Sequence, residues 1–238
     1  FQKQINQGLF GNKSTKQIKK ICKDKIDSFG KQIESLGLDF IFEKNNRKYI
    51  EIGNNNKLIT FKVWYKSVFT NIPSFVKIQI NFLEKIEFDI NTKNTLTLIK
   101  ENISNEEKIY FKEFITFYQN KKLFVYDIRE IVAEKIRSLL TRRAIKSRDA
   151  IDLMFIYQKY KINPEELIKE AKEKIEFAMK YYEKYKENFI STKEKIDKIS
   201  FHYDEVRHLV IKDFKREEFE GFIKNLFPLL YKILKEIS

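Results

Sequence analysis

The sequence predicts an α+β fold, in which a mixed or antiparallel sheet with helices precedes a C-terminal helical bundle. Segments that alternate apolar and polar residues, as strands do, dominate the first half of the chain, whereas apolar residues at helical spacing dominate the second half. The 238 residues include only 6 Gly and 3 Pro, which argues against a loop-rich fold. We therefore expect two regions, a sheet-bearing one at 1–120 and a helical one at 121–238.

The first region is expected to open with a helix from Ser14 to Leu36, which Gly30 interrupts and Gly37 ends. The segments that have the composition of strands are 38–42, 48–52, 58–65, 75–82, 85–90 and 123–126. The segment 75–82 is the clearest, since its apolar side chains alternate with Lys77, Gln79 and an asparagine.

Residues 127–160 are predicted to form two helices joined by a basic turn. The apolar stripe of the first helix consists of Ile128, Ile131, Val132, Ile136 and Leu139. Lys135 falls inside this stripe. Because a lysine that points at a core is costly unless an anionic group meets it, we expect such a group nearby.

The second helix is predicted to begin near Ser147, a suitable N-cap residue. Its sequence is apolar nearly all round, so we expect it to be buried. Asp149 and Asp152 lie in its first turn, three residues apart and on neighbouring faces.

The turn between the two helices is strongly basic, with Arg142, Arg143, Lys146 and Arg148. A core-facing cation, two carboxylates near a helix N-terminus and a cluster of cations can hold a polyanion, typically a phosphate, with or without a metal. A purely structural interpretation explains the same residues equally well: a carboxylate that favours the helix dipole, and a lysine that extends past a helix end to water.

After residue 160 the chain is expected to be helical to its end. Asn163 and Pro164 are typical of a helix start, and this helix is predicted to run to about Glu187. A short basic piece at 192–199 follows. Helices at 203–214 and 217–237 complete the predicted bundle, with a kink at the proline inside the last one.

Composition narrows the function classes. The formal net charge of +13 favours a polyanionic partner, such as RNA, DNA or nucleotide phosphates, although a lysine-rich solvated surface also explains it. One Cys and two His are too few for the usual zinc clusters, so any metal would be held by carboxylates, which favours Mg²⁺ or Mn²⁺. No apolar run is long enough to cross a membrane and no signal peptide is visible, so we expect a cytoplasmic protein.

Three segments carry a family resemblance. EIVAEKIR at 130–137 and KSRDAIDL at 146–153 resemble the nucleotidyltransferase toxins of the AbiEii/AbiGii type, and VKIQINF at 76–82 followed by Glu84 is similar to a strand of that family. The resemblance implies a polymerase-β-like nucleotidyltransferase fold and the transfer of a nucleotide from an NTP to an RNA acceptor, for which tRNA is a candidate. It also implies divalent metal cofactors, Mg²⁺ or Mn²⁺, and a cognate antitoxin partner.

The resemblance also assigns roles to residues of the two helices. It implies that Lys135 contacts the triphosphate, and that Asp149 or Asp152 orients this lysine or the acceptor. The basic residues of the turn, Arg143, Lys146 and Arg148, would then bind phosphate.

Two departures from the family pattern concern the metal. The family's Gly-Ser turn with its Asp-x-Asp strand is not found in the sequence, so we expect it either to lie upstream of Phe1 or to be lost in a degenerate copy. The third carboxylate position matches Gln79, which cannot be an anionic ligand. Glu87 and Asp89, on the polar side of the predicted strand 85–90, are substitute candidates, although a solvated face explains them as well. The alternative functions are a catalytically incomplete RNA- or nucleotide-binding module and a protein-interaction scaffold.

Overall fold

The computed structural model describes residues 14–53, 58–82, 84–96, 103–117, 121–210 and 214–237. The chain divides into two compact units. The first consists of Phe1–Ile86, Leu140–Arg143 and Lys172–Asp197, and the second of Glu87–Leu139, Ala144–Ala171 and Lys198–Ser238. The predicted boundary near residue 120 stays a prediction.

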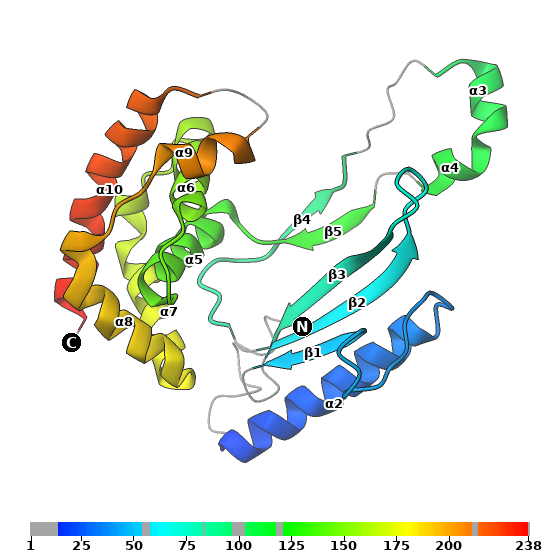
Figure 1. The fold of residues 1–238 in the computed structure, drawn as a ribbon, viewed down its shortest axis with the longest axis horizontal. Coiled ribbons are helices and arrows are strands. Elements are labelled where there is room, and N and C mark those ends of the chain that lie inside the picture. Colours follow the sequence, from blue (N-terminus) through cyan, green and yellow to red (C-terminus); the bar gives the residue numbers. More distant parts are fainter. Residues whose placement is uncertain are drawn as a thin grey trace. The chain divides into compact units, whose positions relative to one another are not determined.

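The first unit contains a long helix packed on an antiparallel sheet (Figure 1). These elements are α2 Thr15–Glu34, β1 Ile50–Gly53, β2 Leu58–Lys66 and β3 Pro73–Asn81, with the strands in this order in the sheet. The core between helix and sheet is formed by Ile18, Cys22, Ile26, Ile33, Phe40, Tyr49, Ile50, Ile59, Phe61, Val63 and Phe82. Because apolar residues of α2 recur at helical spacing and those of β2 alternate, each element has one apolar face, and the two faces cover each other.

Helix α2 begins as the sequence predicts. The Ser14 hydroxyl accepts a hydrogen bond from the Gln17 backbone, and the Gln17 side chain accepts one from the Ser14 backbone N–H. The predicted interruption at Gly30 is wrong, because the helix continues through it. A Cβ atom at Gly30 would lie 2.0 Å from Cδ2 of the Phe42 ring, so this glycine is needed for a close approach. Gly37, with a φ of +68°, ends the turn that follows the helix.

Gly30→Ala is expected to lower the free energy of unfolding by about 1–3 kcal/mol, because the Phe42 ring has to move. Gly221→Ala is the matched control, since Gly221 also lies inside a helix but a Cβ atom added there would meet no neighbouring atom within 4 Å. It is expected to raise the free energy of unfolding by about 1 kcal/mol through helix propensity. Urea unfolding of both variants measures the difference, and equal stabilisation by both would contradict the packing seen at Phe42.

Two of the predicted strands are wrong. Residues 38–42 form no strand beyond a single bridge between Asp39 and Trp64, and 85–90 has no regular secondary structure. In both segments a carboxylate accepts hydrogen bonds from backbone N–H groups that would otherwise donate to a neighbouring strand. Glu34 accepts from the N–H of Phe42, and Glu130 accepts from two N–H groups within 85–90.

The remaining predicted strands are confirmed with shifted ends. The segment 48–52 forms β1 two residues later than expected, and 58–65 and 75–82 form β2 and β3. The segment 123–126 corresponds to β5 Lys122–Val125, which pairs with β4 Asn91–Asn94 in the second unit.

The other elements are helical. Their bounds are α3 Asn105–Tyr110, α4 Lys112–Phe117, α5 Ile128–Thr141, α6 Ser147–Tyr160, η3 Pro164–Leu167, α7 Ile168–Tyr181, α8 Glu183–Lys195, η4 Ile196–Lys198, α9 Tyr203–Val206, η5 Arg207–Leu209 and α10 Arg216–Glu236. The helix expected from 163 to 187 is therefore divided at Tyr182, whereas α10 continues through Pro228. The α+β class is confirmed, with small antiparallel sheets and helices up to β5 and helices after it. In the parts of the chain that the structure describes, no helix is both long and apolar enough to cross a lipid bilayer.

Candidate functional site

Helix α5 is anchored at its start and buried along one stripe. The Asp127 carboxylate accepts hydrogen bonds from the backbone N–H and the guanidinium of Arg129, each at 2.9 Å. These bonds, chiefly those from the guanidinium, lower the pKa of Asp127 to about 2, so the carboxylate stays charged and caps the helix. Val132, Ile136 and Leu139 are fully buried, as the predicted stripe requires.

Helix α6 is held by a different contact from the one predicted. Lys146, not Ser147, occupies the N-cap position, and no side chain caps the helix. The Ser147 hydroxyl instead donates to Glu205 at 2.6 Å and accepts from the His202 backbone N–H at 3.3 Å. Both partners belong to the α9 region, so the hydroxyl joins two elements and is not available for its own helix.

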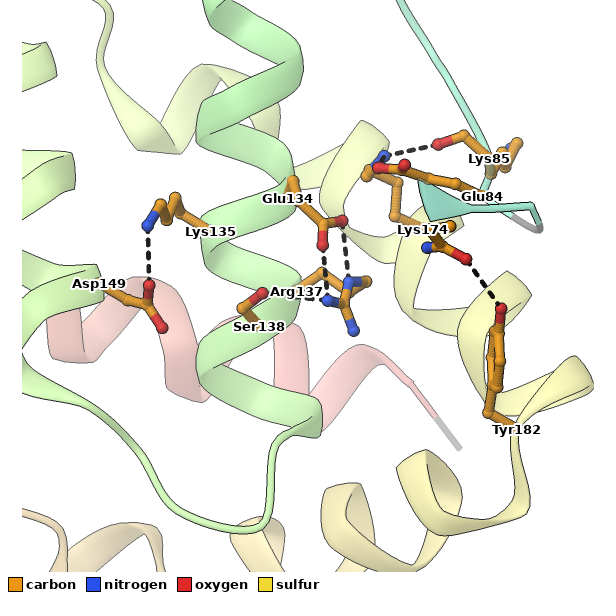
Figure 2. A network of polar contacts seen from close by, with 10 residues as sticks. Glu84, Lys85, Glu134, Lys135, Arg137, Ser138, Asp149, Lys174 and Tyr182 are labelled. Atoms are coloured by element: carbon orange, nitrogen blue, oxygen red, sulfur yellow. Dashed lines mark hydrogen bonds and ion pairs between the residues drawn. The ribbon is translucent and has the colours of Figure 1, made fainter. Parts of the chain in front are cut away.

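Lys135 of α5 lies between the two carboxylates of α6. Its Nζ is 2.8 Å from Oδ1 of Asp149 and 2.5 Å from Oδ2 of Asp152, and Figure 2 shows the contact with Asp149. The side chain of Asp149 is 2% exposed, that of Lys135 25% and that of Asp152 48%. The anionic group expected beside Lys135 is therefore present twice, once buried and once open to solvent.

The electrostatics keep Lys135 charged. Burial of the ammonium lowers its pKa, but the hydrogen bonds to Asp149 and Asp152 and the charges of these carboxylates outweigh burial, so the pKa of Lys135 is raised above its ordinary value. A lysine in this state is a fixed cation at neutral pH, and not a general base. Such a cation can bind and stabilise negative charge, and its partner Asp152 is open to solvent.

The predicted phosphate-binding residues lie in the chain between the end of α5 and the first turn of α6. Arg143 follows the end of α5, Lys146 precedes α6, and Arg148 lies in its first turn. All three side chains are exposed. Their role in binding phosphate stays a prediction.

The candidate metal ligands do not form a metal site within the described residues. Glu87 is half-buried and Asp89 is exposed, and neither lies on a strand, contrary to the prediction. Gln79 is exposed on β3, where its amide donates to the Thr60 hydroxyl at 3.4 Å. Among the residues that the structure describes, no three His, Cys, Asp or Glu side chains converge to hold a metal ion.

Helix α5 makes two polar contacts that were not predicted from the sequence. Glu130 is 1% exposed and accepts hydrogen bonds from the backbone N–H groups of Glu87 and Phe88, at 2.8 and 3.0 Å. Arg137 donates two hydrogen bonds to Glu134, at 2.9 and 2.6 Å (Figure 2). The spacing of three residues between Glu134 and Arg137 was a usable signal for this pair. Nothing in the sequence indicates which backbone groups Glu130 binds.

A buried lysine in the first unit was also missed. The Lys174 side chain is 1% exposed, and its Nζ donates to the Lys85 carbonyl oxygen at 2.5 Å and lies 3.5 Å from a carboxylate oxygen of Glu84 (Figure 2). Lys85 in turn forms an ion pair with Glu173, the neighbour of Lys174 on α7. These contacts join the α7 residues to the segment that follows β3.

A comparison with protein families agrees with the two sequence motifs. The family model described as "Nucleotidyl transferase AbiEii toxin, Type IV TA system" matches residues 9–232, which include both helices of the Lys135 site and strand β3. No curated protein and no solved structure matches the chain significantly. The match spans nearly the whole chain and confirms the resemblance seen in the α5 and α6 segments. The chain therefore belongs to the AbiEii nucleotidyl transferase toxin family of type IV toxin–antitoxin systems.

Proposed function

We propose that this protein transfers a nucleotide from an NTP to an RNA acceptor, for which tRNA is a candidate, and acts as the toxin of a toxin–antitoxin pair. Membership of the family supports the class of reaction and suggests a cognate antitoxin. The observation that carries the proposal in this chain is the charged Lys135, which Asp149 and Asp152 hold at hydrogen-bonding distance beside solvent.

In the proposed reaction the protein positions groups and stabilises charge. The Lys135 ammonium contacts the triphosphate and stabilises the negative charge of the transferring phosphoryl group. Asp149, which is buried, fixes the lysine, and the more exposed Asp152 orients the lysine or the acceptor. The exposed cations around the start of α6, Arg143, Lys146 and Arg148, bind phosphate oxygens of the substrates.

Mg²⁺ or Mn²⁺ is the cofactor that the proposal expects. The described residues do not supply a converging set of metal ligands, so no residue of this chain is assigned to the ion. The transfer assay with and without Mg²⁺ tests whether the reaction requires the ion.

The test is incubation of the protein with each radiolabelled NTP and total tRNA, with and without Mg²⁺. We expect label in the RNA with one or more NTPs, and loss of this label when Mg²⁺ is chelated. Absence of transfer together with salt-sensitive tRNA binding would instead favour the catalytically incomplete binding module. Absence of both would favour the interaction scaffold.

Asp152→Asn is expected to lower the rate of transfer about tenfold or more, about 1.4 kcal/mol of transition-state free energy. The amide keeps the shape of the side chain but removes the charge that lies 2.5 Å from the Lys135 ammonium. Glu187→Gln is the control, because Glu187 is an exposed carboxylate of α8 and makes the same change of charge. Single-turnover transfer rates compare the two, and equal rates would contradict the role of Asp152.

A further inference from the structure

The sheet of the first unit has one covered face and one open face. Side chains of neighbouring residues in a strand point to opposite faces, and the pairing registers fix which ones lie together. Helix α2 and the apolar core cover the face of Ile50, Ile59 and Phe61. The opposite face, called here the open face, carries Glu51, Thr60, Lys62, Trp64, Lys66, Phe75, Lys77 and Gln79. Thr60 is buried and Trp64 half-buried on this face, whereas Lys66, Phe75, Lys77 and Gln79 are exposed.

Two aromatic rings lie side by side on the open face. Trp64 and Phe75 are paired across β2 and β3, and their ring centroids are 4.9 Å apart. The indole N–H of Trp64 donates to the Lys48 carbonyl oxygen at 2.8 Å, which fixes the ring on the sheet. Phe75 is 40% exposed, so a large apolar ring in a regular strand contacts water. A flat ring held in this way can stack with a nucleobase.

Cations surround these rings. Lys62 and Lys77 are paired across the strands, and Nζ of Lys62 lies 5.7 Å from the Phe75 ring centroid. Lys66 lies on the same face at the end of β2. The carboxylate on this face, Glu51, is bound by Lys62 at 2.5 Å. That hydrogen bond chiefly, with the charges of Lys62, Lys77 and Arg47, lowers the pKa of Glu51.

The charges on the open face sum to a positive value, because one carboxylate stands against three lysines. Gln79 is neutral and therefore adds no negative charge to this face. An amide at this position can donate and accept hydrogen bonds, as the edge of a base requires, and it does not repel phosphate as a carboxylate would. A flat surface with an exposed phenylalanine ring among cations fits a strand whose bases are unpaired, since a duplex keeps its bases stacked inside.

We propose that the open face of the β1–β2–β3 sheet binds single-stranded RNA, with a base stacked on Phe75 and phosphates bound by Lys66 and Lys77. The inference rests on the proposed function in one respect, namely that the acceptor is RNA. It adds the surface that binds the RNA, and it specifies that the bound RNA is single-stranded.

The test is fluorescence anisotropy of a labelled single-stranded RNA of about 12 nucleotides, measured without NTP at several salt concentrations. Phe75→Ala is expected to weaken binding about tenfold, through loss of one stacked base. Lys77→Ala is expected to weaken it a few-fold and to reduce the slope of log K against log salt by about 0.7, the value for one phosphate of a single strand. Phe124→Ala, at an exposed phenylalanine of β5, and Lys20→Ala, at an exposed lysine of α2, are expected to change nothing.

Several outcomes would overturn the proposal. One is wild-type affinity in a Phe75→Ala variant that circular dichroism shows to be folded. Others are equal affinity for duplex RNA, tighter binding of single-stranded DNA of the same sequence, or displacement of the RNA by polyglutamate as effectively as by unlabelled RNA. Because the measurement requires no catalysis, RNA binding without nucleotide transfer would refute the proposed function and leave this inference standing.

Discussion

Lys135→Ala is expected to reduce nucleotide transfer at least about a hundredfold, the effect of removing one positioned charge-stabilising group from a transition state. The lysine is the cation that the proposal directs at the triphosphate, and the substitution takes it away from both of its carboxylate partners, Asp149 and Asp152. Lys159→Ala is the control, because Lys159 is an exposed lysine of α6. Transfer by a folded Lys135→Ala variant at the wild-type rate would contradict the proposed site.

The same substitution is expected to affect stability, and this effect has to be separated from catalysis. Asp149 is almost fully buried, and without Lys135 its charge costs about 1–3 kcal/mol of the free energy of unfolding. A Lys135→Ala, Asp149→Asn double variant also removes the buried negative charge, so it should regain stability while transfer stays low. Since the pKa of Lys135 is raised in the fold, the stabilising attraction is complete below the ordinary pKa of 10.5 and is lost only as the pH rises through the raised value.

Lys174→Ala is expected to lower the free energy of unfolding by about 3–5 kcal/mol. The substitution leaves the Lys85 carbonyl and the Glu84 carboxylate without the buried ammonium that lies 2.5 and 3.5 Å from them. Lys169→Ala, at an exposed lysine of the same helix, is expected to change the free energy of unfolding by less than about 0.5 kcal/mol. Denaturant unfolding followed by circular dichroism measures both.

A second variant tests the cause of that loss. Lys174→Met with Glu84→Gln fills the buried space with an apolar chain and removes the carboxylate charge that faced the ammonium, so it should recover most of the lost stability. If Lys174→Ala unfolds at the wild-type denaturant midpoint, the contacts of the Lys174 ammonium do not stabilise the fold. If the double variant is no more stable than Lys174→Ala, the loss comes from packing, and not from the charge.

The sequence predicted elements well where their signal is local. The apolar stripe of α5 repeats every three to four residues, and β2 and β3 are long enough to show alternation, so neighbouring residues suffice to recognise these elements. The prediction failed at 85–90, where alternation was also present. There the N–H groups of Glu87 and Phe88 bind a carboxylate some 40 residues away, and no pattern within the segment reveals that partner.

The candidate site also has features that the sequence predicts and features that only the tertiary structure shows. A lysine inside an apolar stripe allowed the sequence alone to predict that Lys135 has an anionic neighbour. The family resemblance came from the segments EIVAEKIR and KSRDAIDL. Only the tertiary structure decided that two carboxylates bind Lys135, that one is buried and the other exposed, and that Lys174 and Glu130 are buried polar anchors. The reason is physical: helical periodicity is set by residues three or four apart, whereas the burial and pairing of a charge depend on elements that the chain brings together from distant positions.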